Sequence, residues 1–181
     1  MDAEAGAPDA ESTGRPEARP EIPTNQRGYW LAQLNVARLK APLESPAMAG
    51  FVALLDPINA LADAQPGFVW RHQGEHGHEV GLLGEPDLLV NLSVWASLEA
   101  LREFTYGDAA PSAHGVAVGR RREWFSKMDG PHQALWWVER GHLPTLDEAG
   151  ERLRHLRHHR SSGYAFTFRS PHPAPEPAER A

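Results

Sequence analysis

The clearest pattern along the chain is the alternation of apolar and polar residues in short runs, which is typical of strands with one covered face. The most regular run is LLVNLSVW, residues 88–95, in which Asn91 and Ser93 interrupt an otherwise apolar strand. Similar runs predict three further strands, at about 30–37, 67–71 and 133–138.

The segment after the first strand has helical signals at both ends. Ser45 is suited to the N-cap, with Pro46 at the first helical position, and Pro66-Gly67 ends the helix. Pro57 lies inside this segment and cannot donate a backbone hydrogen bond to residue 53. We therefore expect a kink at Pro57, or a restart with Asp56 as a new cap.

The second half of the chain contains another strand-helix-strand order. Ser97 is placed to cap a helix that pauses after LEALREF, resumes at about His114 and runs to Met128. Between the second and third strands, the glycine- and histidine-rich residues 72–86 are expected to form a long hairpin connection.

The predicted order β-α-β-β-α-β defines an α+β fold of the ferredoxin-like class, with an antiparallel sheet and both helices on one face. Thr145 and Glu148 form the capping box of an additional helix to about Arg160, and residues 164–168 could add a short final strand. Neither element is expected to cover the second face of the sheet. Pairing of two sheets in a homodimer, as in a dimeric α+β barrel, would cover it.

Length and composition predict one ordered domain between two tails. The chain has 181 residues, of which 41% are apolar. Residues 1–27 contain too few large apolar side chains to offset the entropy of ordering, so they are expected to be a disordered tail. Residues 28–170 are the expected barrel domain, and the proline-rich residues 171–181 are a second disordered tail.

Charge and cysteine content exclude several classes of function. The net charge of −6 and pI near 5.9 would repel nucleic acids and anionic membranes, so neither is expected as a partner. The absence of cysteine excludes disulfides, thiol nucleophiles and thiolate-bound metals. The chain shows no signal-peptide pattern and no apolar run of about 18 residues, which predicts a cytoplasmic protein.

Several long strings resemble a known bacterial family. They are LAQLNVARLKAPLESPAMAGFVALLDPINALADAQPGFVWR, VNLSVWASLEALREF, RRREWF, ALWWVERGHLPTLDEAGERL and AFTFRSPHPAP. Together they resemble the family of domain of unknown function 3291, over residues 29–175. That family is similar to the dimeric α+β barrel superfamily, which includes antibiotic-biosynthesis-type monooxygenases, haem-degrading enzymes and chlorite-dismutase-like haem proteins. The resemblance implies a fold, and no site residues can be carried over from it.

The stretch HGVAVGRRREWF, residues 114–125, is one candidate site. On a helix, His114, Arg121 and Phe125 share a face, which suits an anionic or enolate-like substrate. His114 could be a general base or a haem axial ligand, and Arg121 could hold a carboxylate or an oxyanion. The alternative is an ordinary solvated helix face with apolar residues beneath it.

Polar residues inside the predicted strands are the second candidate. Asn35, Asn91 and Ser93 would be costly to bury without partners, and Asn91 and Ser93 share a face with Trp95. This face could line a pocket, with Asn91 as a catalytic group. Alternatively, it meets a second subunit, or the amides bond across the sheet.

Aromatic and histidine residues complete the candidates. Six tryptophans could line a cavity for a flat ligand or fill the core, and Trp137 is our candidate ligand contact. The histidine-rich segments HQGEHGHE and HLRHH offer possible metal ligands, but both lack an obvious carboxylate framework, and they lie in a glycine-rich loop and at the end of a charged helix. No metal site is therefore predicted, except His114 as axial ligand if haem binds.

The expected function is that of a small dimeric α+β barrel protein acting on an aromatic or polyketide-like metabolite, as a monooxygenase-like enzyme. A cofactor-free enzyme would use His114 as base and Asn91 or Arg121 to stabilise the anion, whereas a haem enzyme would use His114 as ligand. The alternative is a non-catalytic module that binds a hydrophobic ligand or dimerises. The expected substrate-binding residues are Asn35, Ser93, Trp95, Phe125 and Trp137.

Overall fold

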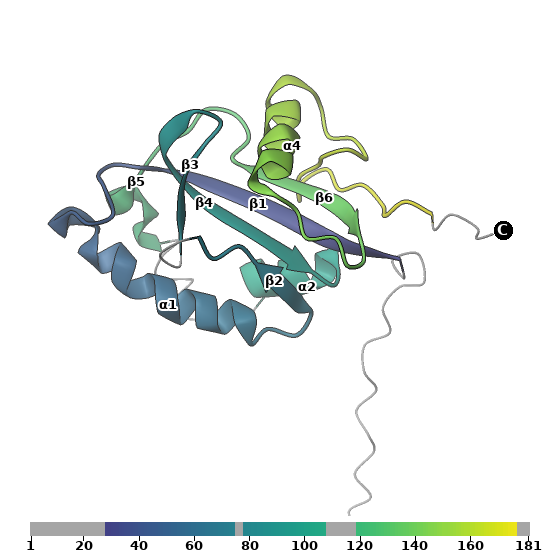
Figure 1. The fold of residues 1–181 in the computed structure, drawn as a ribbon, viewed down its shortest axis with the longest axis horizontal. Helices are drawn as coiled ribbons and strands as arrows, with labels where there is room; N and C mark the ends of the chain where they lie inside the picture. The colour runs from purple at the N-terminus through teal and green to yellow at the C-terminus, as the bar shows by residue number, and fades with distance from the viewer. Residues whose placement is uncertain (1–27, 75–77, 108–118, 177–181) are drawn as a thin grey trace, which may run out of the picture.

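A single antiparallel sheet organises the computed structural model, which describes residues 28–74, 78–107 and 119–176 (Figure 1). Its central strand, β1 (Tyr29–Leu39), pairs with β4 (Glu85–Trp95) on one side and β6 (Gln133–Glu139) on the other. The alternating pattern of residues 88–95 therefore belongs to a strand in the middle of the sheet.

Short strands extend the sheet on both sides. Strands β2 (Phe68–Arg71) and β3 (Glu79–Leu82) pair with successive parts of β4, and β5 (Phe125–Ser126) pairs with the end of β1. The resulting order β2-β4-β1-β6 and the helices between the strands confirm the predicted ferredoxin-like α+β fold.

Two helices cover one face of this sheet. The 3-10 turn Pro46–Met48 leads directly into α1 (Ala49–Asp63), and α2 (Leu98–Tyr106) follows β4. Ser97 accepts a hydrogen bond from the Ala100 backbone N–H, which confirms its predicted capping role. Helix α1 runs uninterrupted through Pro57, so the expected restart at Asp56 is wrong.

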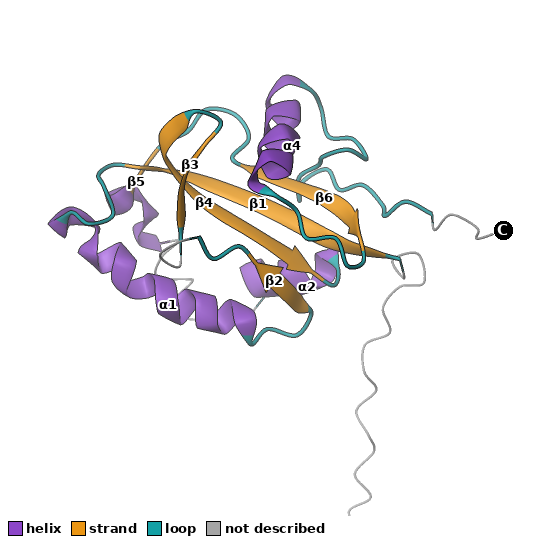
Figure 2. Cartoon of the chain, viewed as in Figure 1, coloured by secondary structure: helices purple, strands orange, loops and turns teal. Residues whose placement is uncertain are grey.

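The other face is covered by a third helix, α4 (Leu146–His158), which lies across it (Figure 2). Ala149, Leu153 and Leu156 of this helix are buried against the even-numbered residues of β1, β4 and β6. The expectation that no element covers this face is therefore wrong, because α4 buries it within one chain. The homodimer stays a prediction, but it is no longer needed to cover this face of the sheet.

The connection after β2 differs from the expected long loop. Residues 79–82 form β3, and a tight turn at Leu83-Gly84 joins it to β4, which begins at Glu85. Leu83 and Gly84 have φ angles of 58° and 77°, as the turn of a two-residue hairpin requires. The turn lies beneath α4, where the Leu83 side chain approaches Gly150.

The helix expected to run to Met128 is also shorter. Within the described residues it covers 119–124, and Phe125–Ser126 then pair with Arg38 and Leu39 as β5. Phe125 is therefore on a strand, and the prediction that it shares a helical face with Arg121 is wrong.

The C-terminal segment lies against the sheet rather than adding a full strand. Phe166 makes a β-bridge with Leu135 and Thr167 a local one with Ser170, so the expected strand at residues 164–168 is reduced to two isolated bridges. Further along, the Trp137 indole donates to the His172 carbonyl over 2.8 Å, and Ala174 is buried. The part of the predicted tail at residues 171–176 is thus held on the domain, and the remaining domain boundaries stay predictions.

None of the helices in the described ranges combines the length and apolar composition needed to cross a bilayer.

Candidate functional site

Three amide side chains form a row across the centre of the face of the sheet that α1 and α2 cover. Asn35 on β1 lies opposite Asn91 on β4 and, on its other side, opposite Gln133 on β6. Since neighbouring strands are about 4.8 Å apart, the row spans about 10 Å. We call these three residues the amide row.

A second polar pair adjoins the row one step along the strands. Gln33 precedes Asn35 on the same face of β1, and it lies opposite Ser93 of β4. The Ser93 hydroxyl donates to the Gln33 side-chain carbonyl over 2.9 Å. The polar area is thus about 7 Å long in the strand direction.

Apolar clusters bound this polar area at both ends of the same face. One cluster contains Trp95 and Phe104 of α2, and the other contains Phe51 of α1 and Trp124. Trp95 stacks on Phe104 at 5.1 Å, and Phe51 contacts Trp124 at 5.6 Å between ring centroids. The amides therefore interrupt a face that is otherwise built for burial.

The amide row has no internal partners. No hydrogen bond joins the side chains of Asn35, Asn91 or Gln133 to any residue in the part of the chain that the structure describes. Asn91 is exposed, and Asn35 and Gln133 are half-buried. An amide that is covered without a hydrogen-bond partner costs stability. The side chains of the row are therefore expected to form hydrogen bonds with water or with a ligand.

Helix α1 presents an apolar stripe on this side of the sheet. Phe51 and Ala62 are buried in the two end clusters, and the half-buried Leu55 and Ile58 lie between them at helical spacing. The helix is thus anchored at both ends over the polar area.

Two of the predicted ligand contacts are parts of the core. Trp95 is 1% exposed, and its indole N–H donates to the Ser93 hydroxyl over 3.0 Å. Trp137 is also buried, beside Phe166. Phe125 packs edge-on to Phe51 in the opposite cluster, so these three aromatic residues flank the amide row rather than join it.

The candidate stretch around residues 114–125 is only partly described. His114 lies outside the described residues, so its role stays a prediction. Arg121 is exposed, and it makes no hydrogen bond or ion pair with the described residues. Its neighbour Arg120 pairs with Glu123 at 2.7 Å and lies over Trp124, which is how a solvated helix face behaves.

Sequence reasoning found Asn35, Asn91 and Ser93 but missed Gln33 and Gln133. Gln33 is two residues before Asn35 in the same strand, so the alternating pattern already places both side chains on one face. Gln133 begins its strand, and only the register of three strands aligns it with Asn35.

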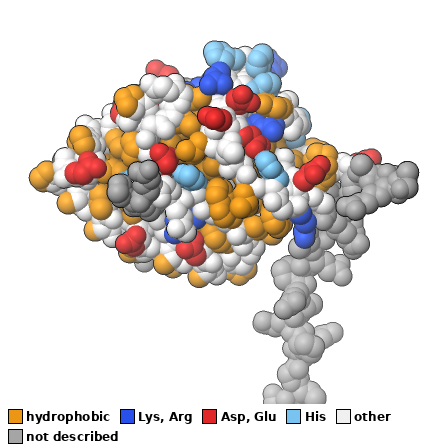
Figure 3. All heavy atoms as spheres, in the orientation of Figure 1, with side chains coloured by type: hydrophobic (Ala, Val, Ile, Leu, Met, Phe, Trp, Pro, Cys, Tyr) orange, Lys and Arg blue, Asp and Glu red, His pale blue; other side chains and the backbone are white. Residues whose placement is uncertain are grey.

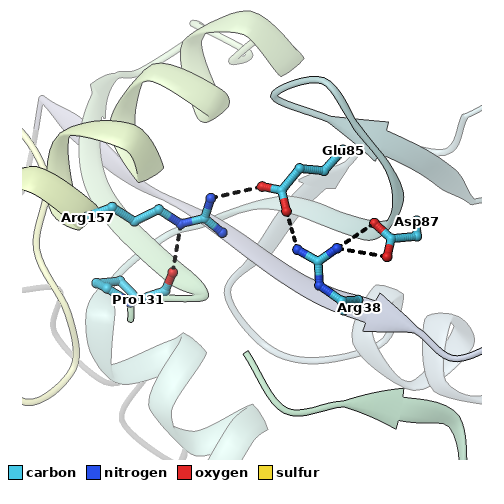
Figure 4. A network of polar contacts seen from close by, with 5 residues as sticks. All are labelled: Arg38, Glu85, Asp87, Pro131 and Arg157. Atoms are coloured by element: carbon cyan, nitrogen blue, oxygen red, sulfur yellow. Dashed lines mark hydrogen bonds and ion pairs between the residues drawn. The ribbon is translucent and has the colours of Figure 1, made fainter. Parts of the chain in front are cut away.

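A separate network of charged residues lies near the opposite end of β1 from the Trp95 cluster (Figure 4). Arg38 donates to both Glu85 and Asp87, and Arg157 of α4 donates to Glu85 over 3.1 Å and to the Pro131 carbonyl. The hydrogen bond from Arg38 is the largest influence and lowers the pKa of Glu85; burial opposes it, and Arg157 acts in the same direction as Arg38. This network joins α4 to β1 and β4, which is a structural role.

The histidine-rich segments do not form a metal centre in the described ranges. His155 and His159 lie 4.5 Å apart between ring centroids at the end of α4, and histidine side chains gather over this helix in Figure 3. His72 bonds to Glu79 at 3.1 Å. No group of three or more potential ligands is close enough to hold a metal ion among residues 28–74, 78–107 and 119–176.

The fold and site together define a ferredoxin-like α+β protein with an amide-lined sheet face under α1. The family model of the domain of unknown function DUF3291 matches residues 30–181, and the chain belongs to that family. A comparison with curated proteins finds no match.

The chain is also similar to several solved structures at low sequence identity. SnoaB, a cofactor-independent oxygenase from Streptomyces nogalater, is 18% identical, with 64% of this chain and 98% of that chain covered and a TM-score of 0.42. A conserved protein from Methanosarcina mazei is 12% identical and has a TM-score of 0.44; the match covers 63% of this chain and 95% of that protein. A candidate antibiotic biosynthesis monooxygenase from Chloroflexus aurantiacus is 14% identical and has a TM-score of 0.38; the match covers 65% of this chain and 98% of that protein.

Proposed function

We propose that the amide row binds a planar, aromatic or polyketide-like metabolite with carbonyl and hydroxyl groups, and that the chain is a monooxygenase-like enzyme acting on it. The observation that carries the proposal is the alignment of Asn35, Asn91 and Gln133 across three strands without a partner among the described residues. Each amide can donate and accept, so the row matches a ligand with both kinds of group.

The surroundings of the row support a flat and largely apolar ligand. The polar area of about 7 by 10 Å is comparable to the face of a fused-ring system. Leu55 and Ile58, which are half-buried on α1, would supply aliphatic contacts, and the exposure of Asn91 leaves the row accessible from solvent. A polar floor with an apolar cover is the usual composition of a small-molecule site.

The cofactor-free version of the reaction needs little from the protein beyond anion stabilisation. A substrate with an acidic methylene group loses a proton, and the anion passes one electron to O₂. The radical pair combines to a hydroperoxide, which loses water to leave a carbonyl group. One oxygen atom enters the product, and the other leaves as water with the two methylene hydrogens. Amide N–H groups aimed at the substrate oxygen would stabilise the anion.

The proton must be taken by a group outside the amide row, because none of the row residues is ionisable at neutral pH. His114 remains our proposed base, and Arg121 a proposed second anion-stabilising group. In the haem-dependent version, His114 would instead hold the haem iron, which would supply the chemistry with O₂. A Soret band on reconstitution with haem that is lost in His114→Ala would support that version, and an unchanged spectrum would contradict it.

The test uses anthrone as substrate and anthraquinone sulfonate as a stable binding probe. The protein should speed the conversion of anthrone to anthraquinone with uptake of O₂. Asn35→Ala and Asn91→Ala should each slow it about tenfold, which corresponds to one lost hydrogen bond to the anion. The proposal is overturned if the wild-type protein neither binds the probe nor speeds the oxidation of anthrone.

A second candidate is a non-catalytic module that binds the same class of metabolite. It is favoured by the absence of an ionisable side chain in the amide row itself. Under this alternative, anthraquinone sulfonate binds and Asn91→Ala weakens it, but anthrone oxidation matches the rate without protein. The two functions therefore differ in turnover and agree in binding.

A further inference from the structure

A chain of hydrogen bonds runs from the core to the edge of the amide row. The Trp95 indole donates to the Ser93 hydroxyl over 3.0 Å, and the Ser93 hydroxyl donates to the Gln33 carbonyl over 2.9 Å. Trp95 and Ser93 are 1% and 4% exposed, whereas Gln33 is half-buried. The chain therefore begins in the core and ends at a side chain that a ligand can reach.

The direction of this chain is fixed by chemistry. An indole N–H can only donate, so Ser93 must accept from Trp95. The hydroxyl has one proton, and its only acceptor among the described residues is the side-chain oxygen of Gln33. A flipped Gln33 amide would leave that buried proton without an acceptor, which is costly. Gln33 therefore presents its NH₂ group, and not its carbonyl, away from Ser93.

This sets Gln33 apart from the amide row beside it. Asn35, Asn91 and Gln133 have no hydrogen bond within the described ranges that fixes which amide atom faces a ligand. Each of them can turn to match a donor or an acceptor. Gln33 is held as a donor by two residues that do not themselves reach the row.

We propose that Gln33 is the specificity-determining donor of this site, and that Trp95 and Ser93 are positioning residues that hold it in that state. The site would then select planar ligands with an acceptor oxygen, such as a ketone or enolate, placed at Gln33. This inference rests on the proposed function, and it narrows the substrate class to aromatic ketones and their enolates. A hydrogen-bond donor at the same place would be rejected, because it would face the NH₂ group.

The test compares fluorenone with fluorene, two flat ligands of nearly the same shape, of which only fluorenone has an acceptor oxygen. Affinities are measured on the full-length protein by quenching of tryptophan fluorescence. The wild-type protein should prefer fluorenone about tenfold, as expected for one well-placed hydrogen bond. Gln33→Met should remove most of this preference while fluorene still binds.

The positioning residues are tested through Ser93→Ala, which removes the acceptor for Trp95 and the donor to Gln33. The preference for fluorenone should fall several-fold because the Gln33 amide can then turn, and the Trp95 indole proton should shift in ¹H–¹⁵N spectra. Gln133→Met is the matched control, since it removes an amide from the row that is not held by Ser93. It should leave the preference within about twofold.

The outcomes separate this inference from the proposed function. If the wild-type protein binds neither flat ligand, both fail. If it binds both equally, or if Gln33→Met keeps the full preference, the role of Gln33 is wrong and the amide-row site stands. If only Ser93→Ala keeps the full preference, the positioning by Trp95 and Ser93 is wrong. Circular dichroism confirms that each variant is folded, and Gln33→Met decides the role of Gln33 should Ser93→Ala unfold.

Discussion

Asn35 and Asn91 lie directly opposite each other on β1 and β4, and neither amide is hydrogen-bonded within the described part of the chain. Facing amides on adjacent strands are close enough to interact, with Cβ atoms about 5 Å apart. Asparagine is disfavoured in strands, so two asparagines at the centre of a sheet are the kind of local cost that proteins keep at functional sites.

This cost leads to the first prediction, which uses Asn91→Val. Valine favours a strand more than asparagine, so the free energy of unfolding should rise by about 0.5 kcal/mol in urea titrations. The same change should weaken the binding of anthraquinone sulfonate about tenfold in fluorescence quenching, because the row loses one of its three amides. A gain in stability with loss of binding would identify Asn91 as a residue kept for function.

The control is Gln65→Ala, which removes a half-buried amide that follows α1 and lies outside the amide row. It should leave probe binding within about twofold. Asn91→Val would contradict the interpretation if it bound the probe as tightly as the wild-type protein.

The sequence predicted the long strands well, because alternation with a period of two survives wherever one side of a strand is covered. It did not predict β3, where EVGLLGE has glycines and few polar residues at alternating positions. It also missed β5, because a strand of two residues has no period. β3 depends on pairing with β4 across a two-residue turn, and β5 depends on contacts with the end of β1, which lies far away in the chain.

The candidate site was predicted only in part, because the sequence shows polar residues within a strand but not the register between strands. Asn35 and Asn91 are visible as polar residues inside apolar strands, whereas Gln133 joins them only through the register of β6 on β1. The covering role of α4 was also out of reach, since the pattern of a helix does not tell which face of a sheet it packs on. The sequence shows Leu153 and Leu156 as apolar residues of a helix, and only the structure shows that they pack on the even-numbered residues of the sheet.

The second prediction concerns two serines that precede helices. The Ser97 hydroxyl accepts from the Ala100 backbone N–H over 3.1 Å, whereas the buried Ser45 hydroxyl has no partner among the described residues. Ser97→Ala should therefore cost about 1 kcal/mol of unfolding free energy. Ser45→Ala should cost nothing or stabilise the protein, because it removes an unpaired hydroxyl. Equal losses in urea titrations of the two variants would refute the assignment.

The third prediction tests the cover that α4 provides. Leu153 is fully buried between α4 and the sheet, so Leu153→Ala should destabilise the protein by about 3 kcal/mol. Arg154→Ala, on the exposed side of the same helix, should change the stability by less than about 0.5 kcal/mol. Thermal unfolding followed by circular dichroism distinguishes the two. A Leu153→Ala variant as stable as Arg154→Ala would mean that α4 does not rest on this face in solution.

The fourth prediction concerns the pH dependence of the network around Glu85. The hydrogen bond from Arg38 lowers the pKa of Glu85 in the folded state below its ordinary value of 4.5, and Arg157 adds to this effect. A carboxylate whose pKa is lower in the folded state stabilises the fold fully above its unfolded pKa. That contribution is lost as the pH falls through the folded pKa, because the unfolded chain binds the proton more readily.

Glu85→Gln removes this carboxylate, and at pH 7 it should lower the unfolding free energy by about 1 kcal/mol, since the network is partly exposed and screened. The difference from the wild-type protein should shrink as the pH is lowered from 5 toward 3, where the wild-type carboxylate takes up its proton. Glu44→Gln, an exposed residue with no ion pair in the described ranges, should track the wild-type curve across this window. Urea midpoints at each pH measure the effect. A gap between Glu85→Gln and the wild-type protein that stays constant down to pH 3 would show that the ionised form of Glu85 does not hold α4 to the sheet.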